Sequence, residues 1–321
     1  MEHPQFNRIP TSYFKGIPSF VEDESYVSAF GLQWIKHAKT QLDSHTRLSI
    51  TRDRLLRMFG PLYSSLDMKV VLEAGCGAGR FTEILVENNT LVTAVDLSIA
   101  VLANYENNGS NPNLRIARAS ITELPFGKEQ FDYVFCPGVV QHTPSPAKSI
   151  LALYQQVKPG GWLIFDQYRY NLSSFLKVTW VLRLILKRLK PEKGLELTDL
   201  LVKMWLPVHK KFASNRFLEV LLFRISPITS HYAGYANMSE GDQVAWARLN
   251  THDNLTDFHK HQTTVSGIKR RIKTLGAINQ NFCIMPYTIE VRCQKPSGDK
   301  NLTISNKPVI RKLKGLNIVS G

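Results

Sequence analysis

The fold of this chain is decided by residues 71–81, which read VLEAGCGAGRF. An apolar run with β-branched residues passes through Gly75, Gly77 and Gly79 into a segment of helical length. The stretch therefore predicts a strand, a tight turn and a helix. Each glycine lacks a Cβ where a ligand must approach the backbone closely. Glu73 stands immediately before the turn, where its carboxylate would repel a phosphate and tolerate a cation.

The glycine spacing distinguishes two nucleoside cofactors. A dinucleotide fingerprint spaces its glycines two and then three residues apart and holds a pyrophosphate at the helix N-terminus, whereas both spacings are two here. S-adenosylmethionine carries an ammonium and a sulfonium group and no phosphate, so Glu73 favours it over NAD. Asp96, at the end of the next apolar run, can accept hydrogen bonds from both ribose hydroxyls. Taken alone, Asp96 is equally suited to be the N-cap of a helix that starts near Ser98.

Short apolar runs alternate with helix-length segments from residue 69 to residue 167, which is typical of a parallel sheet with crossover helices. Near the end of the chain, Met285-Pro286 is short enough to connect a hairpin, so one strand of the last pair should run antiparallel to the rest. We expect an α/β core with strands at residues 70–73, 91–96, 113–117, 131–136 and 162–166, and a closing pair at residues 281–284 and 287–292.

Five segments in order resemble the motifs of the class I S-adenosylmethionine-dependent methyltransferases. Glu73-x-Gly75-x-Gly77-x-Gly79 is similar to their first motif. The others are residues 95–98 (VDLS), residues 124–126 (LPF) followed by 131–134 (FDYV), residues 138–146 (GVVQHTPSP) and residues 157–161 (VKPGG). The resemblance implies a Rossmann-like, doubly wound, mostly parallel seven-stranded sheet with an antiparallel last strand and a helical insertion. It also implies S-adenosyl-L-methionine as the cofactor.

The resemblance also assigns the residues that bind the methyl donor. It implies contacts from Glu73, Gly75, Cys76, Gly77, Gly79, Asp96, Leu97, Ser120 and Ile121. Relatives often carry an Asp five residues before the proline of the Leu-Pro-Phe segment, where it accepts a hydrogen bond from the adenine amino group, and here that position is Ser120. A serine hydroxyl accepts without charge assistance, so we expect a functional but weaker donor site.

Upstream segments resemble one bacterial branch of the family that methylates small molecules and sugars. Residues 30–34 (FGLQW) and 40–44 (TQLDS) are similar to N-terminal helices that close over the donor, and residues 16–21 (GIPSFV) to the end of a zinc-ribbon-like segment. No cysteine precedes Cys76, and the four cysteines include no CxxC pair. We therefore expect no metal site.

Methyl transfer is an in-line displacement in which the protein mainly aligns the nucleophile, the methyl carbon and the sulfur. His142 follows the fourth predicted strand at the carboxyl edge of the sheet, where it can deprotonate an acceptor hydroxyl. The alternative is a histidine that only shapes the pocket. The Asn/Asp-Pro-Pro-Tyr signature of N-methylating relatives is absent, since residues 136–139 read CPGV. We expect methylation of an oxygen, or a carbon, of a small metabolite, natural product or glycan sugar.

These features divide the chain into five parts. We expect an N-terminal helical cap over residues 1–60, the donor-binding core over 61–167, a helical lid insertion over 168–262, the end of the core sheet over 263–296 and a basic flexible tail over 297–321. Within the insertion, residues 177–190 are basic and amphipathic. We expect their apolar face to pack on the core while the lysines stay solvated. The alternative is that this stretch rests on an anionic membrane.

The basic residues are concentrated in the second half of the chain. Residues 1–168 hold 15 Lys and Arg and 16 Asp and Glu, whereas residues 169–321 hold 25 and 10. Such an excess attracts RNA, an anionic membrane or an acidic substrate, or is a solvated surface. The alternative functions are therefore an RNA methyltransferase, or a non-catalytic membrane-docking or scaffold protein that retains the fold. No RNA-binding module is recognisable, so nucleic acid is the less favoured partner.

Composition and apolar runs indicate the cellular setting. Hydrophobic residues make up 43% of the chain and charged residues 21%, which is the ordinary globular range. No apolar run follows the polar N-terminus, and the most apolar stretch, residues 178–189, is interrupted by three cations and falls short of the ~20 residues of a membrane span. We expect a cytoplasmic protein, with peripheral membrane contact as the alternative. The acceptor and the oligomeric state stay open.

Overall fold

The computed structural model of the protein describes residues 2–22, 27–172, 177–230 and 237–297. These residues form two compact units. Unit 1 comprises residues 2–22, 49–170 and 259–297, and unit 2 comprises the described residues of 27–48 and 171–258. The basic tail expected over residues 297–321 lies outside the described residues from position 298 onward.

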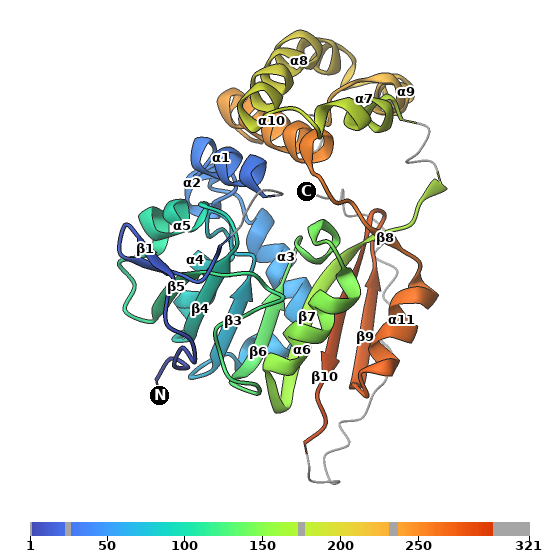
Figure 1. Ribbon diagram of the computed structural model, residues 1–321. Helices are drawn as coiled ribbons and strands as arrows, with labels where there is room; N and C mark the ends of the chain where they lie inside the picture. The colour runs from blue at the N-terminus through green and yellow to red at the C-terminus, as the bar shows by residue number, and fades with distance from the viewer. Residues whose placement is uncertain (1, 23–26, 173–176, 231–236, 298–321) are drawn as a thin grey trace. The chain divides into compact units, whose positions relative to one another are not determined.

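Unit 1 is built on one mixed sheet (Figure 1). Its inner strands are continuous runs of β-branched and other apolar residues, as expected for parallel strands that are buried on both faces. The strands are β1 (Ser12–Phe14), β2 (Ile17–Ser19), β3 (Val70–Ala74), β4 (Leu91–Asp96), β5 (Leu114–Arg118), β6 (Phe131–Cys136), β7 (Val157–Arg169), β8 (Gln262–Thr263), β9 (Ile278–Ile284) and β10 (Thr288–Gln294).

The strands lie in the order β1-β2-β5-β4-β3-β6-β7-β10-β9, and β8 pairs with the end of β7. From β5 to β7 all neighbours are parallel, whereas β10 is antiparallel to both β7 and β9. The predicted α/β fold, a mostly parallel sheet with an antiparallel last strand, is confirmed. The short strands β1, β2 and β8 extend the sheet beyond the seven predicted strands. The strand order reverses at β3 and β6, and in such sheets ligands bind outside the carboxyl ends of the strands at that point.

Side chains of the central strands alternate between two apolar cores. In β3, Val70 and Leu72 belong to the core on one face of the sheet, and Val71 belongs to the core on the other. Helices α6 and α11 contribute to the first core, and α3, α4 and α5 to the second. The helical segments of unit 1 are α3 (Ile50–Phe59), η1 (Gly60–Ser65), α4 (Thr82–Leu85), η2 (Val86–Asn88), α5 (Val101–Asn108), η3 (Val140–His142), α6 (Pro146–Gln156) and α11 (Val265–Thr274).

The regular elements of unit 2, among its described residues, are all helices, and they come both from the predicted insertion and from residues 27–48, which the sequence predicts to be part of the N-terminal cap. A small core of Val202, Leu206, Ile228 and Ala247 joins α8 and α10. The helices are α1 (Ser28–Lys36), α2 (Asp43–Thr46), α7 (Val178–Leu186), α8 (Pro191–Phe212), α9 (Arg216–Ile225) and α10 (Glu240–Thr256).

Helix α7 buries a different face from the one that the sequence pattern predicts. Its buried residues are Thr179, Arg183 and Leu186, whereas Val181 and Ile185 are 60% and 64% exposed. The expectation that the apolar face of this stretch packs on the core is therefore wrong for α7, and the cation inside the helix, Arg183, is buried instead. The physical reason is Arg183, whose guanidinium donates to the backbone carbonyl of Asp257 and lies 3.8 Å from its carboxylate.

Candidate functional site

The glycine turn follows β3 at its carboxyl end. Gly75, Gly77 and Gly79 have φ values of +83°, +52° and +88°, a region that side chains with a Cβ rarely adopt. A Cβ on Gly75 would lie 2.2 Å from a methyl carbon of Val139, which belongs to the loop after β6. The turn therefore needs glycine both for its backbone and for the close approach of that loop.

Asp96, the last residue of β4, binds the turn directly. Its Oδ2 accepts a hydrogen bond from the backbone N–H of Gly77 at 2.9 Å, and its Oδ1 accepts from the N–H and hydroxyl of Ser98 at 2.9 and 2.7 Å. Helix α5 begins only at Val101, and its N-cap residue is Ala100. The alternative interpretation of Asp96 as the helix N-cap is therefore wrong. Leu97 follows it, and its carbonyl accepts from the Arg118 side chain.

Glu73 lies beneath the turn with no exposed surface. One carboxylate oxygen, Oε2, accepts a hydrogen bond from the Thr82 hydroxyl at 2.5 Å, whereas Oε1 is buried and has no hydrogen-bond partner among the described residues. Burial raises the pKa of Glu73 to about 8, against the opposing effects of the Thr82 hydrogen bond and the Arg80 charge. A cationic group placed beside Oε1 would satisfy this oxygen and favour the ionised form.

Three asparagines of α5 donate hydrogen bonds to the glycine turn and to the first residue of α4. Asn107 donates to the carbonyl of Ala78 at 2.9 Å, Asn108 donates to the carbonyl of Gly79 at 3.1 Å, and Asn104 donates to the Thr82 hydroxyl at 2.9 Å. Sequence reasoning missed these residues. Their spacing of three and four places them on one face of a helix, which is the signal that identifies such a group.

The remaining donor-site candidates lie on neighbouring segments of unit 1. Ser120, two residues after β5, shares a hydrogen bond with the Thr122 hydroxyl at 2.8 Å, and Ile121 beside it is buried. Cys76 lies within the turn and is 4% exposed. Burial, together with the charges of Asp96 and Glu73, raises the pKa of the Cys76 thiol well above its usual range. A thiol that is kept neutral in this way is a poor nucleophile.

His142 ends the short helix η3 that follows β6. Its ring meets the Tyr168 ring edge to face, with 5.3 Å between the centroids. The ammonium of Lys260 lies 5.5 Å from the centroid of the same tyrosine ring. Because Val139, in the same loop, is in close contact with Gly75, this loop brings the segment of His142 to the glycine turn.

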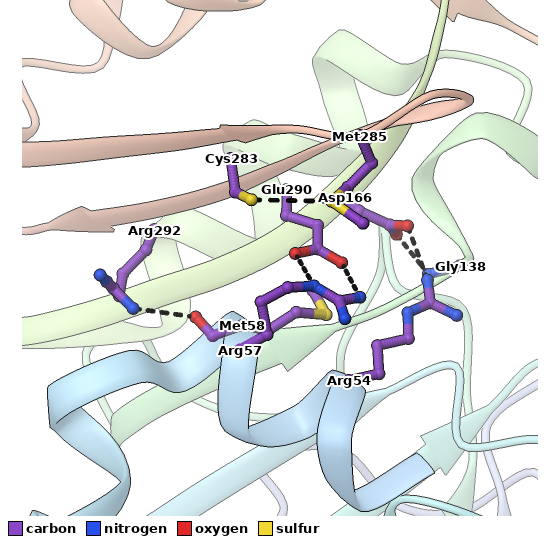
Figure 2. Close-up of polar contacts among 9 residues, drawn as sticks. All are labelled: Arg54, Arg57, Met58, Gly138, Asp166, Cys283, Met285, Glu290 and Arg292. Atoms are coloured by element: carbon purple, nitrogen blue, oxygen red, sulfur yellow. Dashed lines mark hydrogen bonds and ion pairs between the residues drawn. The ribbon is translucent and has the colours of Figure 1, made fainter. Parts of the chain in front are cut away.

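A buried carboxylate on β7 fixes the start of that loop. Figure 2 shows Asp166 between the loop and α3: its Oδ1 accepts from the backbone N–H of Gly138 at 2.5 Å, and its Oδ2 accepts from Arg54 at 2.7 Å. Asp166 has no exposed surface. The Arg54 guanidinium also lies 5.8 Å from the centroid of the Phe81 ring, at the end of the glycine turn. Arg54 therefore links the two loops that surround the carboxyl ends of β3 and β6.

A second arginine of α3 binds the neighbouring strand. Arg57 makes a two-point ion pair with Glu290 of β10, with Nε–Oε2 and Nη2–Oε1 distances of 2.9 and 2.7 Å (Figure 2). Glu290 is 4% exposed. Sequence reasoning missed both arginine pairs because their partners lie far apart along the chain.

The residues around the turn fit S-adenosylmethionine. The buried Oε1 of Glu73 lacks a partner that an ammonium group can supply. Gly75 and Gly79 allow the turn to pack tightly, because a Cβ on either would clash with Val139 or with Asn104. Asp96 already accepts hydrogen bonds from Gly77 and Ser98. Its remaining lone pairs can accept hydrogen bonds from ribose hydroxyls. No cationic side chain forms an ion pair with Glu73 or Asp96 among the described residues.

Comparison with known proteins identifies the same region. Residues 72–165 match the family model described as a methyltransferase domain. The chain is 29% identical over 174 residues to a protein named ubiquinone biosynthesis O-methyltransferase from Pseudomonas entomophila, which covers 52% of this chain and 73% of the relative. A protein of the same name from Hydrogenovibrio crunogenus is 31% identical over 117 residues, covering 36% of this chain and 48% of the relative.

Solved structures of similar proteins are more distant in sequence. An S-adenosylmethionine-dependent methyltransferase from Mesorhizobium loti is 14% identical, covers 76% of this chain and 98% of its own, and has a TM-score of 0.46. The magnesium protoporphyrin IX methyltransferase from Synechocystis, solved with bound S-adenosylhomocysteine, is 15% identical, covers 84% of this chain and 97% of its own, and has a TM-score of 0.45.

Proposed function

We propose that this chain, a class I S-adenosylmethionine-dependent methyltransferase, transfers its methyl group to an oxygen atom of a small molecule. The observation that carries the proposal is the intact glycine turn held between Asp96 and a buried glutamate, Glu73, that has one oxygen free of hydrogen bonds. When bound, S-adenosylmethionine supplies an electrophilic methyl group on a positively charged sulfur.

Different residues in and around the turn bind different parts of the donor. Glu73 accepts hydrogen bonds from the ammonium end, and Asp96 accepts from the ribose hydroxyls. The backbone of Gly75 to Gly79 lies against the ligand, and Leu97, Ser120 and Ile121 border the adenine. Asn104, Asn107 and Asn108 keep the turn in shape, so the site is formed before the ligand arrives.

His142 is the residue that we assign to proton removal from the acceptor. An acceptor hydroxyl becomes a better nucleophile when a base takes its proton, and imidazole is suited to this near neutral pH. Asp166 keeps the loop of His142 in place through the N–H of Gly138. The edge-on contact with Tyr168 limits how the imidazole ring can turn.

One line of support favours oxygen as the acceptor atom, and a second disfavours nitrogen. The relatives reported above are named O-methyltransferases. The loop after β6 begins Cys136-Pro137-Gly138-Val139, which lacks the Asn/Asp-Pro-Pro-Tyr signature of N-methylating relatives. The relatives do not favour the alternatives of an RNA methyltransferase or a non-catalytic scaffold.

Transfer of a radiolabelled methyl group to a panel of phenols, alcohols, sugars and amines tests the proposal. The methylated product is then analysed by NMR for the atom to which the new methyl group is bonded. We expect an O-methyl product. A product methylated only on nitrogen or carbon would contradict the assignment of oxygen while leaving donor binding intact.

A further inference from the structure

Helix α7 turns a stripe of apolar side chains to solvent. Val178, Val181 and Ile185 recur at spacings of three and four, so they lie along one face of the helix. All three are exposed, Val181 and Ile185 by more than half. An amphipathic helix of a globular unit ordinarily buries such a stripe, so this exposure needs an explanation.

The orientation of α7 is fixed by its polar face. Arg183 is 6% exposed and donates to the backbone carbonyls of Asp257 and Phe258. The carboxylate of Asp257, 1% exposed, lies 3.8 Å from the guanidinium. Rotating α7 to bury the valines would separate this pair and leave a buried charge without a partner, which is strongly unfavourable. The exposed stripe is therefore part of the folded state.

Helix α9 exposes a second apolar stripe beside the first. Only Leu222 of this helix is buried, and Phe217 is 76% exposed. The ammonium of Lys177, the residue before α7, lies 3.5 Å from the centroid of the Phe223 ring, so the two helices are neighbours in unit 2 (Figure 1). We call the exposed apolar residues of the two helices the α7/α9 face; they are Val178, Val181, Leu184, Ile185, Phe217, Val220, Leu221 and Ile225.

The surroundings of the α7/α9 face are cationic. Residues 177–225 hold eleven Lys and Arg and four Asp and Glu. Arg188 and Lys190 follow α7, and Arg216 and Arg224 lie on α9; all four are exposed. Apolar side chains flanked by Lys and Arg are typical of helices that lie in the interface of an anionic bilayer.

We propose that the α7/α9 face binds the surface of an anionic phospholipid bilayer, with its apolar side chains in the headgroup region and its cations on the phosphates. None of the described helices is long and apolar enough to cross a membrane. A nucleic acid would pair with the cations but leave the apolar stripes in water, and a second copy of the chain would bring like charges together. A bilayer satisfies both features of the face.

Co-sedimentation with vesicles tests this proposal. The vesicles are phosphatidylcholine alone, or phosphatidylcholine with about a third phosphatidylglycerol to give a negative surface. One variant, Val181→Ser with Ile185→Ser, removes apolar area; a second, Arg188→Glu with Lys190→Glu, reverses charge. Leu151→Ser and Lys128→Glu, at exposed positions of unit 1, are the matched controls. Circular dichroism establishes that each variant is folded.

We expect the wild-type chain to bind anionic vesicles and each double variant to bind about tenfold more weakly or worse. One variant loses attraction to the anionic headgroups, and the other loses apolar area that enters the headgroup region. The controls should stay within about twofold, because they lie outside the face. Raising the salt concentration should weaken binding of the wild type.

Three results would overturn the proposal. These are equal binding to neutral and anionic vesicles, unchanged binding of both double variants, and a dimer in analytical ultracentrifugation that Val181→Ser with Ile185→Ser dissociates while vesicle binding persists. The measurement requires neither methyl donor nor acceptor. Its failure would therefore leave the proposed methyl transfer untouched, and failure of methyl transfer would leave this proposal untouched.

Discussion

Asp166 and Glu290 lie directly opposite one another in the antiparallel pair of β7 and β10. Both carboxylates are almost completely buried. Two like charges opposite each other destabilise a sheet unless cations neutralise them. Arg54 and Arg57, at a spacing of three on α3, supply one cation to each (Figure 2). The pairing fixes α3 to the sheet, and through Gly138 it fixes the loop that carries His142.

Replacing Arg54 tests this arrangement. Arg54→Gln leaves the buried Asp166 without its cation, so the free energy of unfolding should fall by about 3 kcal/mol in urea titrations. Arg52→Gln, on the same helix, is the control, because Arg52 pairs with Glu87 at the exposed surface and should change stability by less than about 1 kcal/mol. Equal losses for the two variants would show that Asp166 does not depend on Arg54.

The raised pKa of Glu73 predicts that donor binding releases a proton. With a pKa of about 8 in the free protein, Glu73 is largely protonated at pH 7, and a cationic ligand would ionise it. Calorimetric titrations with S-adenosylmethionine in phosphate and in Tris should therefore give different apparent enthalpies. Glu73→Gln should weaken binding roughly tenfold or more and abolish the buffer dependence, since charged hydrogen bonds contribute about 1.5–3 kcal/mol. Glu87→Gln, at the surface, is the control.

The same shift has a consequence for the stability of the free protein. Because the pKa of folded Glu73 lies above the unfolded value of 4.5, the folded state retains a proton that the unfolded state loses. The contribution of Glu73 to stability is therefore present below pH 4.5 and lost as the pH rises to 8. Glu73→Gln should reduce this dependence in urea titrations across that pH range. An unchanged slope would contradict the raised pKa.

His142→Ala tests the assignment of the base. Loss of a general base should lower kcat by roughly 10²–10⁴-fold, with the affinity for S-adenosylmethionine changed by less than about twofold. A decrease in kcat of less than about threefold would show that His142 only shapes the pocket.

Buried histidine makes unit 2 sensitive to acid. Burial lowers the pKa of His252 to about 4, and its ring pairs with the Gln33 side chain. The unfolded state binds a proton below pH 6.5, whereas folded His252 does not until about pH 4. The free energy of unfolding should therefore decrease as the pH is lowered from 6.5 to 4. His252→Gln should reduce this slope by up to about 1.4 kcal/mol per pH unit. A slope that His252→Gln leaves unchanged would contradict the lowered pKa.

The parts of the structure that sequence predicts depend on local patterns. The strands at residues 91–96 and 131–136 are found as predicted, because a short apolar run with β-branched residues is itself the signal of a buried strand. The glycine turn is also predictable from local sequence, because positive φ values favour glycine at those positions regardless of distant contacts.

The parts that sequence could not predict depend on partners far along the chain. Arg183 orients α7 through Asp257, 74 residues away, so the apolar pattern of the helix alone indicates the wrong buried face. Arg54 and Asp166 are separated by 112 residues, and no periodicity connects them. The asparagines of α5 are an intermediate case, because their spacing shows a shared face but not what that face binds.

The most direct test of the central claim is calorimetric titration of the wild type, Asp96→Ala and Asp132→Ala with S-adenosylmethionine. Asp96 binds the glycine turn, whereas Asp132 binds the N–H of Val70 at the opposite end of β3. We predict micromolar binding by the wild type and by Asp132→Ala, and its loss in Asp96→Ala. A folded wild type that does not bind the donor, or an Asp96→Ala variant that binds it as tightly as the wild type, would contradict the account.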